Sequence, residues 1–417
     1  MPERYRGETG IVPGALPDGE PVPPGGDLPP GALESLGSRG FGVYVHVPFC
    51  ASRCGYCDFN TYTAAELGGS GPRDGYVDAV LAEIALAGRV LDGGAPAADT
   101  VFFGGGTPTL LTPDELARIL DGVGKAFGLA AGAEVTTEAN PESVDPSTLA
   151  RLRTAGFTRI SLGMQSAAPH VLALLDRRHT PGRAAAAAIE AREAGFAHVN
   201  LDLIYGTPGE TTDDFAESLG RAIAAGVDHV SAYSLIVEDG TRLAARVRRG
   251  EVEAPDDDVA ADRYLAADAA LGDAGFAWYE VSNWATSPRA RCRHNLLYWR
   301  GGDWWGLGPG AHSHVGGVRW WNERHPATYA RRLGEGVTPA RGREVLDAEQ
   351  RRVEQIMLGL RLAEGLDLRL LPEEGMAAAA EAVAAGLLST EGYGTGRAVL
   401  TTRGRLLADG LVRSLVG

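Results

Sequence analysis

The sequence predicts an α/β fold: an incomplete barrel of six parallel strand–helix units, (βα)6, followed by a smaller, mainly helical domain. Three observations predict it. Over residues 41–280, short apolar runs rich in β-branched and aromatic residues alternate with longer stretches rich in Ala, Leu, Glu and Arg. Polar or Gly-rich residues recur where the predicted strands end. Near residue 281 the composition changes.

The region before the barrel, residues 1–40, is rich in Pro and Gly and has no hydrophobic period, so we expect a disordered tail. Its start has no apolar segment after the charges, which is not the pattern of a secretory signal. No run reaches the roughly 18 apolar residues of a transmembrane segment. These features and the clustered cysteines predict a cytoplasmic protein, for which a transient membrane contact is still possible in principle.

The charge of the chain argues against one class of partner. The formal net charge is -15, and no stripe of basic and aromatic residues interrupts the acidic surface expected from it. Such a chain is repelled by phosphate backbones. We therefore expect no nucleic-acid partner.

Six strands are expected in the barrel, each followed by a helix. Three of the helices have start signals: Thr112-Pro113 with Glu115 three residues after the cap, Asp145-Pro146, and Thr180-Pro181. A last helix near 257–274 closes the series. The predicted strands are residues 41–47, 100–105, 134–140, 159–165, 198–206 and 229–236.

The positions of unusual residues favour a barrel over a flat sheet. A cysteine loop follows the first strand, "GGGTPT" ends the second, and Glu138, Gln165 and Asp202 lie at or near the ends of the next three. In a curved parallel sheet these ends converge on one mouth. A flat doubly wound sheet would instead concentrate its site at one switch point.

Beyond the barrel we expect a second domain over residues 281–417, with the barrel domain at 41–280. All seven tryptophans lie between residues 278 and 321. Residues 347–362 have helical periodicity, and the chain ends with a predicted strand, a Thr-capped turn and a short helix. This part is expected to be mainly helical.

Three of the four cysteines form a compact motif. Cys50, Cys54 and Cys57 are spaced C-x3-C-x2-C, and Phe59 stands where a further cysteine could follow. Three thiolates suit a cubane iron–sulfur cluster with one open iron. A structural Cys3His zinc site using His46 is a second interpretation, although no further C-x2-C pair supports it. Chance clustering of buried thiols is a third.

Taken with three further motifs, the cysteine loop resembles that of a known superfamily. The stretches are "YVHVPFC" with its two following cysteines, "FFGGGTPT", "SLGMQS" and "NLDLIYGTPGET". They resemble the radical S-adenosylmethionine superfamily, in the branch of oxygen-independent coproporphyrinogen III dehydrogenases (HemN) and haem chaperones (HemW). The resemblance runs from about Phe41 to the C-terminus. It implies a 4Fe–4S cluster on Cys50, Cys54 and Cys57, whose fourth iron binds S-adenosyl-L-methionine.

The resemblance also implies a set of S-adenosylmethionine-binding residues. Gly106 and Thr107 would contact its methionyl end, and Glu138 would accept hydrogen bonds from the ribose hydroxyls. Glu138 could instead cap a helix or pair at the surface, and Arg177 could belong to a solvated helix face. Further positions of the S-adenosylmethionine pocket are matched by Tyr44, Tyr56 and Ile236, although all three could instead be core packing. The remaining implied residues are Gln165, Arg177 and Asp202.

A haem site is implied by "HNLLYW" at 294–299, which matches the H-N-x-x-Y-W motif of haem chaperones. Neutral imidazole is a common axial ligand of haem iron, and aromatic rings offer flat faces to a porphyrin. His294 is the expected iron ligand, and Asn295, Tyr298 and Trp299 are expected to shape the site. The same residues could simply seal one domain against the other. Rival ligands are His312, His314 and Cys292.

The leading functional hypothesis is a haem chaperone that carries a 4Fe–4S cluster and S-adenosylmethionine and transfers haem to an acceptor protein. One alternative is an oxygen-independent coproporphyrinogen III dehydrogenase. Enzymes of that type carry a further cysteine where this chain has Phe59, which argues against it. The other alternative is a structural zinc protein. The sequence leaves open whether S-adenosylmethionine is cleaved.

Overall fold

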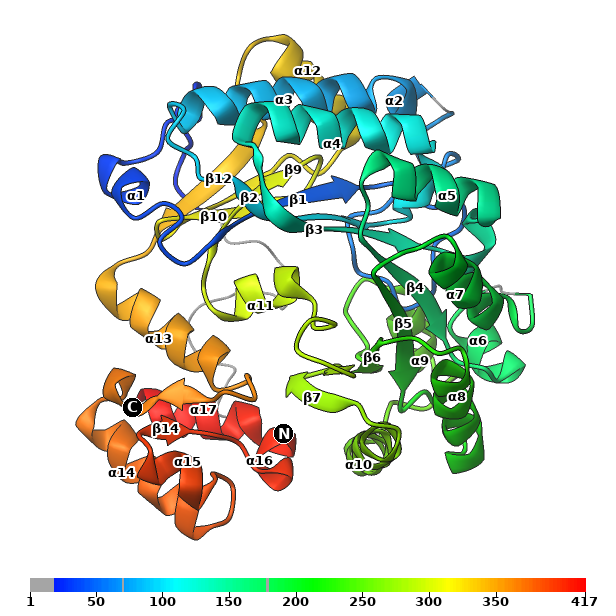
Figure 1. Ribbon diagram of the computed structural model, residues 1–417, viewed down its shortest axis with the longest axis vertical. Helices are drawn as coiled ribbons and strands as arrows, with labels where there is room; N and C mark the ends of the chain where they lie inside the picture. Colours follow the sequence, from blue (N-terminus) through cyan, green and yellow to red (C-terminus); the bar gives the residue numbers. More distant parts are fainter. Residues whose placement is uncertain (1–18, 70, 178–179) are drawn as a thin grey trace.

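The structure, a computed structural model, describes residues 19–69, 71–177 and 180–417. In this part of the chain a 12-stranded sheet is curved, and most helices cover its outer face (Figure 1). The strand order is β12-β11-β10-β9-β1-β2-β3-β4-β5-β6-β8-β7. The sheet strands are β1 (Phe41–Val47), β2 (Ala98–Gly105), β3 (Leu129–Ala139), β4 (Arg159–Gln165), β5 (His198–Tyr205), β6 (His229–Ser234), β7 (Ala277–Glu280), β8 (Asn283–Ala285), β9 (Asp303–Leu307), β10 (His312–Val315), β11 (Val318–Asn322) and β12 (Ala340–Val345).

All six predicted barrel strands are present, as β1 to β6. Each pairs in parallel with the next in chain order, which is the arrangement that strand–helix units produce. The predicted α/β class and partial barrel are therefore confirmed. The helices of the barrel region are α2 (Gly71–Asp74), α3 (Tyr76–Val90), α4 (Pro113–Phe127), α5 (Pro146–Ala155), α6 (Pro169–Leu174), α7 (Arg183–Glu193), α8 (Thr212–Ala224), α9 (Arg242–Arg248) and α10 (Asp257–Asp273).

Two of the three helix-start signals are confirmed. Thr112 forms a capping box with Glu115 at the start of α4, and the Asp145 side chain accepts a hydrogen bond from the Thr148 N–H at the start of α5. The Thr180-Pro181 prediction is wrong. There α7 begins at Arg183, and its N-cap is Gly182 with φ +80°, a conformation that favours glycine.

The sheet continues past the predicted domain boundary at 280/281. β8 pairs with β6 in antiparallel, and β9 pairs in parallel with β1, so the later chain extends both edges of the barrel sheet. Its tryptophans Trp305 and Trp320 belong to the barrel core. The strands beyond residue 281 thus bury their apolar faces by joining the existing sheet.

A compact helical part begins only after β12. Its buried residues, from Ile356 to Leu415, form a separate apolar cluster. It also contains a short hairpin of β13 (Leu366–Asp367) and β14 (Arg397–Ala398), and Thr401 caps the turn that follows, as predicted. The helices beyond the barrel are α11 (Arg293–Trp299), α12 (Pro326–Gly334), α13 (Ala348–Gly359), α14 (Glu373–Ala384), α15 (Thr390–Gly394), α16 (Thr402–Leu406) and α17 (Ala408–Val416).

Residues 19–40 differ from the disordered tail expected for 1–40, whereas residues 1–18 lie outside the described part. Glu20 exchanges two backbone hydrogen bonds with Arg343, at 2.8 and 3.0 Å. A short helix follows, α1 (Pro30–Glu34), and Leu33 and Leu36 pack against the barrel core. The Pro and Gly residues here make turns between apolar anchors, and composition alone does not distinguish such a segment from a disordered one.

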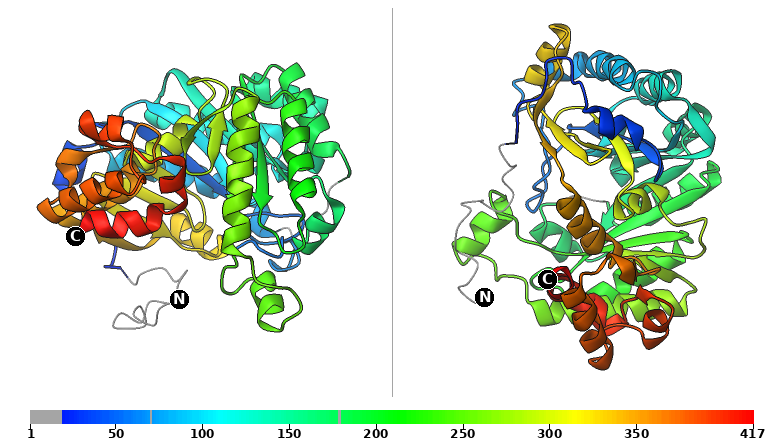
Figure 2. Two further views of the ribbon diagram at one scale, coloured as in Figure 1. Left: turned by 90° about the horizontal axis from the view of Figure 1, so that it is seen from below. Right: turned by 90° about the vertical axis from the view of Figure 1, so that its left-hand side faces the viewer.

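One helix lies on the concave side of the sheet. In Figure 1 α11 lies between the sheet and the C-terminal helices, and Figure 2 shows those helices at one end of the barrel. Within the described residues, none of the helices has the length and apolar character needed to cross a membrane. The carboxyl ends of β1 to β6 and the concave face beside α11 each border a cavity.

Candidate cofactor site

A cavity of about 430 Å³ opens where the barrel strands end. We call it the cofactor cavity. It gathers all the predicted cluster residues and all the predicted S-adenosylmethionine residues except Tyr44. They come from β3, β4 and β5, from the loops after β1, β2 and β6, and from the segment after α6. The predicted residues that line it are Cys50, Cys54, Tyr56, Cys57, Gly106, Thr107, Glu138, Gln165, Arg177, Asp202 and Ile236.

The cysteine loop is held against the Gly-rich loop by backbone hydrogen bonds. Gly106 N–H donates to Val47 O at 2.8 Å, and Thr107 N–H donates to Phe49 O at 2.7 Å. A Cβ on Gly106 would lie only 2.5 Å from Phe49 O, so glycine is required for this approach. The "GGGTPT" motif thus fixes the loop that carries the cysteines.

The three thiols are crowded and partly buried. Burial and the neighbouring Cys57 raise the pKa of the Cys50 thiol to about 11, and burial also raises the pKa of Cys57. The Arg177 guanidinium donates to Cys54 Sγ at 3.4 Å. Three adjacent thiolates in such a place need a positively charged partner, which iron supplies. The donor set therefore fits an iron–sulfur cluster.

A lone zinc ion with His46 as fourth ligand fits less well. The His46 ring shares hydrogen bonds with Tyr44 Oη at 3.1 Å and with Asn60 O at 2.9 Å, so both ring nitrogens have partners. Among the described residues, no three His, Cys, Asp or Glu side chains converge on one point closely enough to hold a single ion. Cysteines that bind three different irons of a cubane need not converge in this way.

Two partly buried carboxyl groups line the cavity together with the cysteines. Burial and the charge of Asp202 raise the pKa of Glu138 to about 8, while the Gly105 N–H donates to its Oε2 at 3.1 Å. Burial also raises the pKa of Asp202, whose oxygens accept from Ser161 Oγ and Asn200 Nδ2, both at 2.8 Å. A cationic ligand with hydroxyl donors would favour the ionised form of both groups.

The end of β4 is built for close approach. The backbone of Gln165 has φ +65°, a left-handed conformation that residues other than glycine rarely adopt. A bulge in the β4–β5 pairing lies at this point. A Cβ on Gly163 would lie 2.7 Å from Gln165 Nε2 and 2.8 Å from Arg177 Nη2. Arg177 also donates to Gly163 O at 3.3 Å. These three residues form one wall of the cavity.

Tyr44, the exception, lines a second cavity of about 380 Å³ on the concave face beside the first. We call it the aromatic cavity. Tyr298 and Trp304 form further parts of its wall. Asp58 and Phe59 line both cavities. The resemblance-based assignment of Tyr44 to S-adenosylmethionine therefore gains no support from its position.

The residues of "HNLLYW" do not face one common cavity. The His294 ring is 1% exposed, and its two nitrogens share hydrogen bonds with Thr100 Oγ1 at 2.7 Å and Tyr298 Oη at 2.9 Å. Asn295 and Trp299 hydrogen-bond Glu280, and these bonds oppose the burial that raises the pKa of Glu280 to about 7. Only Tyr298 reaches the aromatic cavity.

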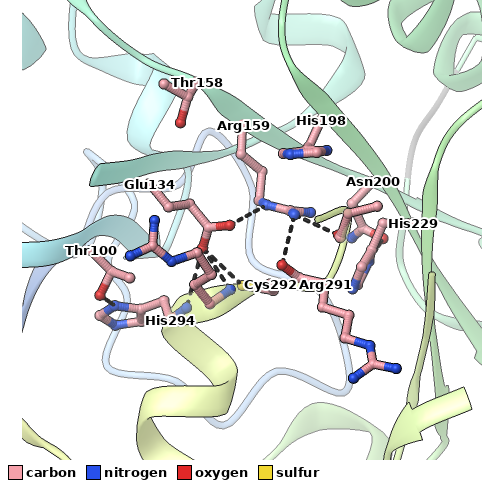
Figure 3. Close-up of polar contacts among 12 residues, drawn as sticks. Thr100, Glu134, Thr158, Arg159, His198, Asn200, His229, Arg291, Cys292 and His294 are labelled. Atoms are coloured by element: carbon pink, nitrogen blue, oxygen red, sulfur yellow. Dashed lines mark hydrogen bonds and ion pairs between the residues drawn. The ribbon is translucent and has the colours of Figure 1, made fainter. Parts of the chain in front are cut away.

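A buried charge network missed by the sequence analysis anchors α11 (Figure 3). Glu134 pairs with Arg159 at 3.0 Å, and both side chains are almost fully buried. The other Glu134 oxygen accepts from the N–H groups of Arg293 and His294 at 2.9 and 3.2 Å. The only signal in the sequence was a charged residue within each of two strands predicted to be buried.

Known proteins resemble this chain over most of its length. Residues 44–222 match the radical SAM superfamily. The chain is 58% identical over 385 residues to heme chaperone HemW of Mycobacterium tuberculosis H37Rv, covering 92% of this chain and 97% of the relative. It is 32% identical to heme chaperone HemW of Bacillus subtilis, covering 80% of this chain and 86% of that one.

Among solved structures, coproporphyrinogen III oxidase (HemN) from Escherichia coli, described as a radical SAM enzyme, aligns with a TM-score of 0.77 and 23% identity. The alignment covers 92% of each chain. At this identity the likeness establishes a shared fold and leaves the reaction undecided.

Proposed function

Because this chain belongs to the HemW family of the radical SAM superfamily, we propose that it binds haem and transfers it to an acceptor protein. Membership of the superfamily implies a 4Fe–4S cluster and S-adenosylmethionine. Cys50, Cys54 and Cys57 would hold the cluster. The protein would act in the cytoplasm, with haem as its cargo.

The observation that carries the proposal is the likeness to a haem chaperone over nearly the whole chain. It extends across the barrel and the C-terminal helices, since 92% of this chain aligns at 58% identity. A similarity confined to the barrel would have supported only the binding of the cluster and S-adenosylmethionine, and not the haem chaperone function. The proposal thus covers the residues around the aromatic cavity as well as those around the cofactor cavity.

In the cofactor cavity, the chain's own residues would bind and orient S-adenosylmethionine. Glu138 would accept the ribose hydroxyls, and Asp202 would offer a second anion for a cationic ligand. Arg177 would stay beside Cys54 and balance thiolate charge. The bound cluster would supply an electron to S-adenosylmethionine if the latter is turned over.

The enzyme alternative, coproporphyrinogen III dehydrogenation, has weaker support. Phe59 is 56% exposed and lines the cofactor cavity, so the place of the further cysteine of such enzymes is taken by an aromatic ring. The fold likeness to HemN applies to both functions. An anaerobic assay with coproporphyrinogen III, S-adenosylmethionine and a reductant separates them, and we expect no protoporphyrinogen.

The proposed function is tested by anaerobic titration of the reconstituted protein with hemin. We expect saturable binding with a shifted Soret band at one haem per chain, followed by transfer of the haem to apomyoglobin added as a surrogate acceptor. Steady formation of protoporphyrinogen, or the absence of saturable hemin binding, would overturn the proposal.

A further inference from the structure

The aromatic cavity has a lining that suits a porphyrin. Its volume of about 380 Å³ is within the usual range of ligand cavities. Tyr298 and Trp304 meet edge to face in its wall, with ring centroids 4.5 Å apart. Flat apolar rings of this kind suit a macrocycle.

Two kinds of polar group complete the lining: imidazoles and a guanidinium. Arg324 lies at the cavity, where it matches the charge of a porphyrin propionate. Two histidines, His46 and His312, line the cavity, but both ring nitrogens of His46 have partners in the surrounding fold. His312 is therefore the candidate for contact with a metal.

A comparison of the three histidines named as haem ligands separates them clearly. His294 is buried and uses both ring nitrogens. His314 is 6% exposed, and its Nδ1 shares a hydrogen bond with Gly302 O at 2.9 Å. The His312 side chain is exposed at the cavity, and within the described residues its ring nitrogens have no hydrogen-bond partner. An iron ligand needs such a free nitrogen.

The position of His312 is fixed although its ring is free. It is the first residue of β10 and stands opposite Trp321, with ring centroids 6.2 Å apart. Its carbonyl oxygen accepts from Trp304 Nε1 at 2.9 Å. Partial desolvation by the surrounding cavity wall and the nearby charges of Arg319 and Arg324 lower the pKa of His312, which keeps the imidazole neutral at pH 7. Neutral imidazole is the form that binds haem iron.

The cysteine loop closes one side of the same cavity. Asn60 Nδ2 donates to Pro309 O at 3.0 Å and to Arg324 O at 2.8 Å, which ties the loop to the segment before β10 and to the segment after β11. Phe59, next in sequence, lines both cavities. The distance between the cluster loop and the histidine is therefore set by direct contacts.

We propose that the aromatic cavity is the haem site, that a ring nitrogen of His312 is the axial ligand of the iron, and that Arg324 pairs with a propionate. The inference rests on the proposed function and replaces the sequence-based assignment of His294 as the ligand. His294 is a positioning residue: its bond to Tyr298 Oη holds that ring in the cavity wall.

Hemin titrations of four proteins test this assignment: the wild type, His312→Ala, His294→Ala and His170→Ala. His170 is an exposed histidine outside the aromatic cavity and serves as the control. We expect His312→Ala to lose at least tenfold in affinity together with the histidine-ligated spectrum. His294→Ala should keep that spectrum, and His170→Ala should match the wild type.

Two further measurements distinguish loss of a ligand from misfolding. Free imidazole should restore the spectrum of His312→Ala, and His312→Cys should shift the Soret band towards that of a thiolate-ligated haem. Binding by His312→Ala equal to wild type, with loss of the ligand spectrum in His294→Ala, would overturn the inference while leaving the chaperone function intact. No saturable hemin binding by the wild type would overturn the function itself.

Discussion

The cofactor cavity and the aromatic cavity share Phe59, yet they draw their other walls from different parts of the chain. Strand ends of the barrel and the loops after them build the first, in the order in which they occur in the sequence. The second combines β1 with β9, β10 and α11, which lie about 250 residues later. The first can therefore be recognised from motifs, whereas the second exists only after the chain beyond the barrel has joined the sheet.

The two cavities also differ in charge. Thiols, carboxyl groups and Arg177 surround the first, and burial raises the pKa values of Cys50, Glu138 and Asp202 there. Aromatic rings and a neutral imidazole dominate the second. The first suits a charged cofactor bound to iron, and the second suits a flat, mostly apolar cargo.

The largest expected effect is loss of the iron–sulfur cluster, which concerns the cofactor cavity alone. Cys54→Ser should abolish the cluster, because two cysteines leave the cubane with too few protein ligands. Iron analysis and absorbance near 400 nm after anaerobic reconstitution measure this. Cys292→Ala, the control, should keep its iron because Cys292 does not line the cavity.

Hemin affinity of Cys54→Ser then tests how independent the two sites are. Since His312 and the aromatic rings are unchanged, we expect less than a threefold change. If the variant lost hemin binding together with its iron, haem binding would require the cluster. The two cavities would then not be independent binding sites.

The next largest effect concerns the anchor of α11. Glu134→Ala leaves Arg159 buried without its partner and removes the acceptor for two backbone N–H groups of the helix. Breaking a buried pair costs about 3–5 kcal/mol, and we expect the free energy of unfolding to fall by that amount. Denaturant unfolding measures it, with Glu217→Ala in the exposed pair Arg221–Glu217 as control.

Hemin binding by Glu134→Ala should weaken more than S-adenosylmethionine binding. Tyr298 depends on α11 for its place in the aromatic cavity, whereas α11 contributes nothing to the lining of the cofactor cavity. Equal losses at the two sites would show that the network supports the whole barrel and not α11 in particular.

The cofactor cavity and the surroundings of α11 differ in how far the sequence predicts them. The six strands could be predicted because each is a short, buried, apolar run. The residues of the cofactor cavity could be predicted because they belong to motifs beside those strands. The role of His294 could not be found this way. Its partners Thr100 and Glu134 lie 194 and 160 residues away, and only the folded chain shows that they occupy its ring and its backbone.

A smaller effect is expected from crowding the cofactor cavity. Gly163→Ala places a methyl group against Gln165 and Arg177, and such overpacking typically costs about 1–3 kcal/mol. Affinity for S-adenosylmethionine, measured by calorimetry, should fall roughly tenfold while hemin affinity is unchanged. Gly220→Ala in α8, where the added methyl meets no neighbour, should leave both affinities unchanged.

The pH dependence of S-adenosylmethionine binding should be smaller still. Glu138 has a pKa of about 8 without ligand, so it holds a proton at neutral pH. Ribose donors and a sulfonium charge favour the ionised carboxylate, and binding therefore releases this proton. Affinity should rise with pH up to about 8, by less than tenfold per pH unit, and then level off. In Glu138→Gln, calorimetry should no longer show the increase of S-adenosylmethionine affinity with pH that comes from ionisation of Glu138.

The smallest effect is expected where the cavities meet. Phe59 is 56% exposed, so Phe59→Ala removes little buried surface from either wall, and we expect each affinity to change less than about threefold. Parallel titrations with S-adenosylmethionine and hemin measure both. Because the ring lines both cavities, the more informative quantity is the coupling between them: the hemin affinity with and without saturating S-adenosylmethionine. Coupling that exists in the wild type and disappears in Phe59→Ala would make this ring the connection between the sites. Coupling that survives the substitution would instead be assigned to the hydrogen bonds of Asn60 with Pro309 and Arg324.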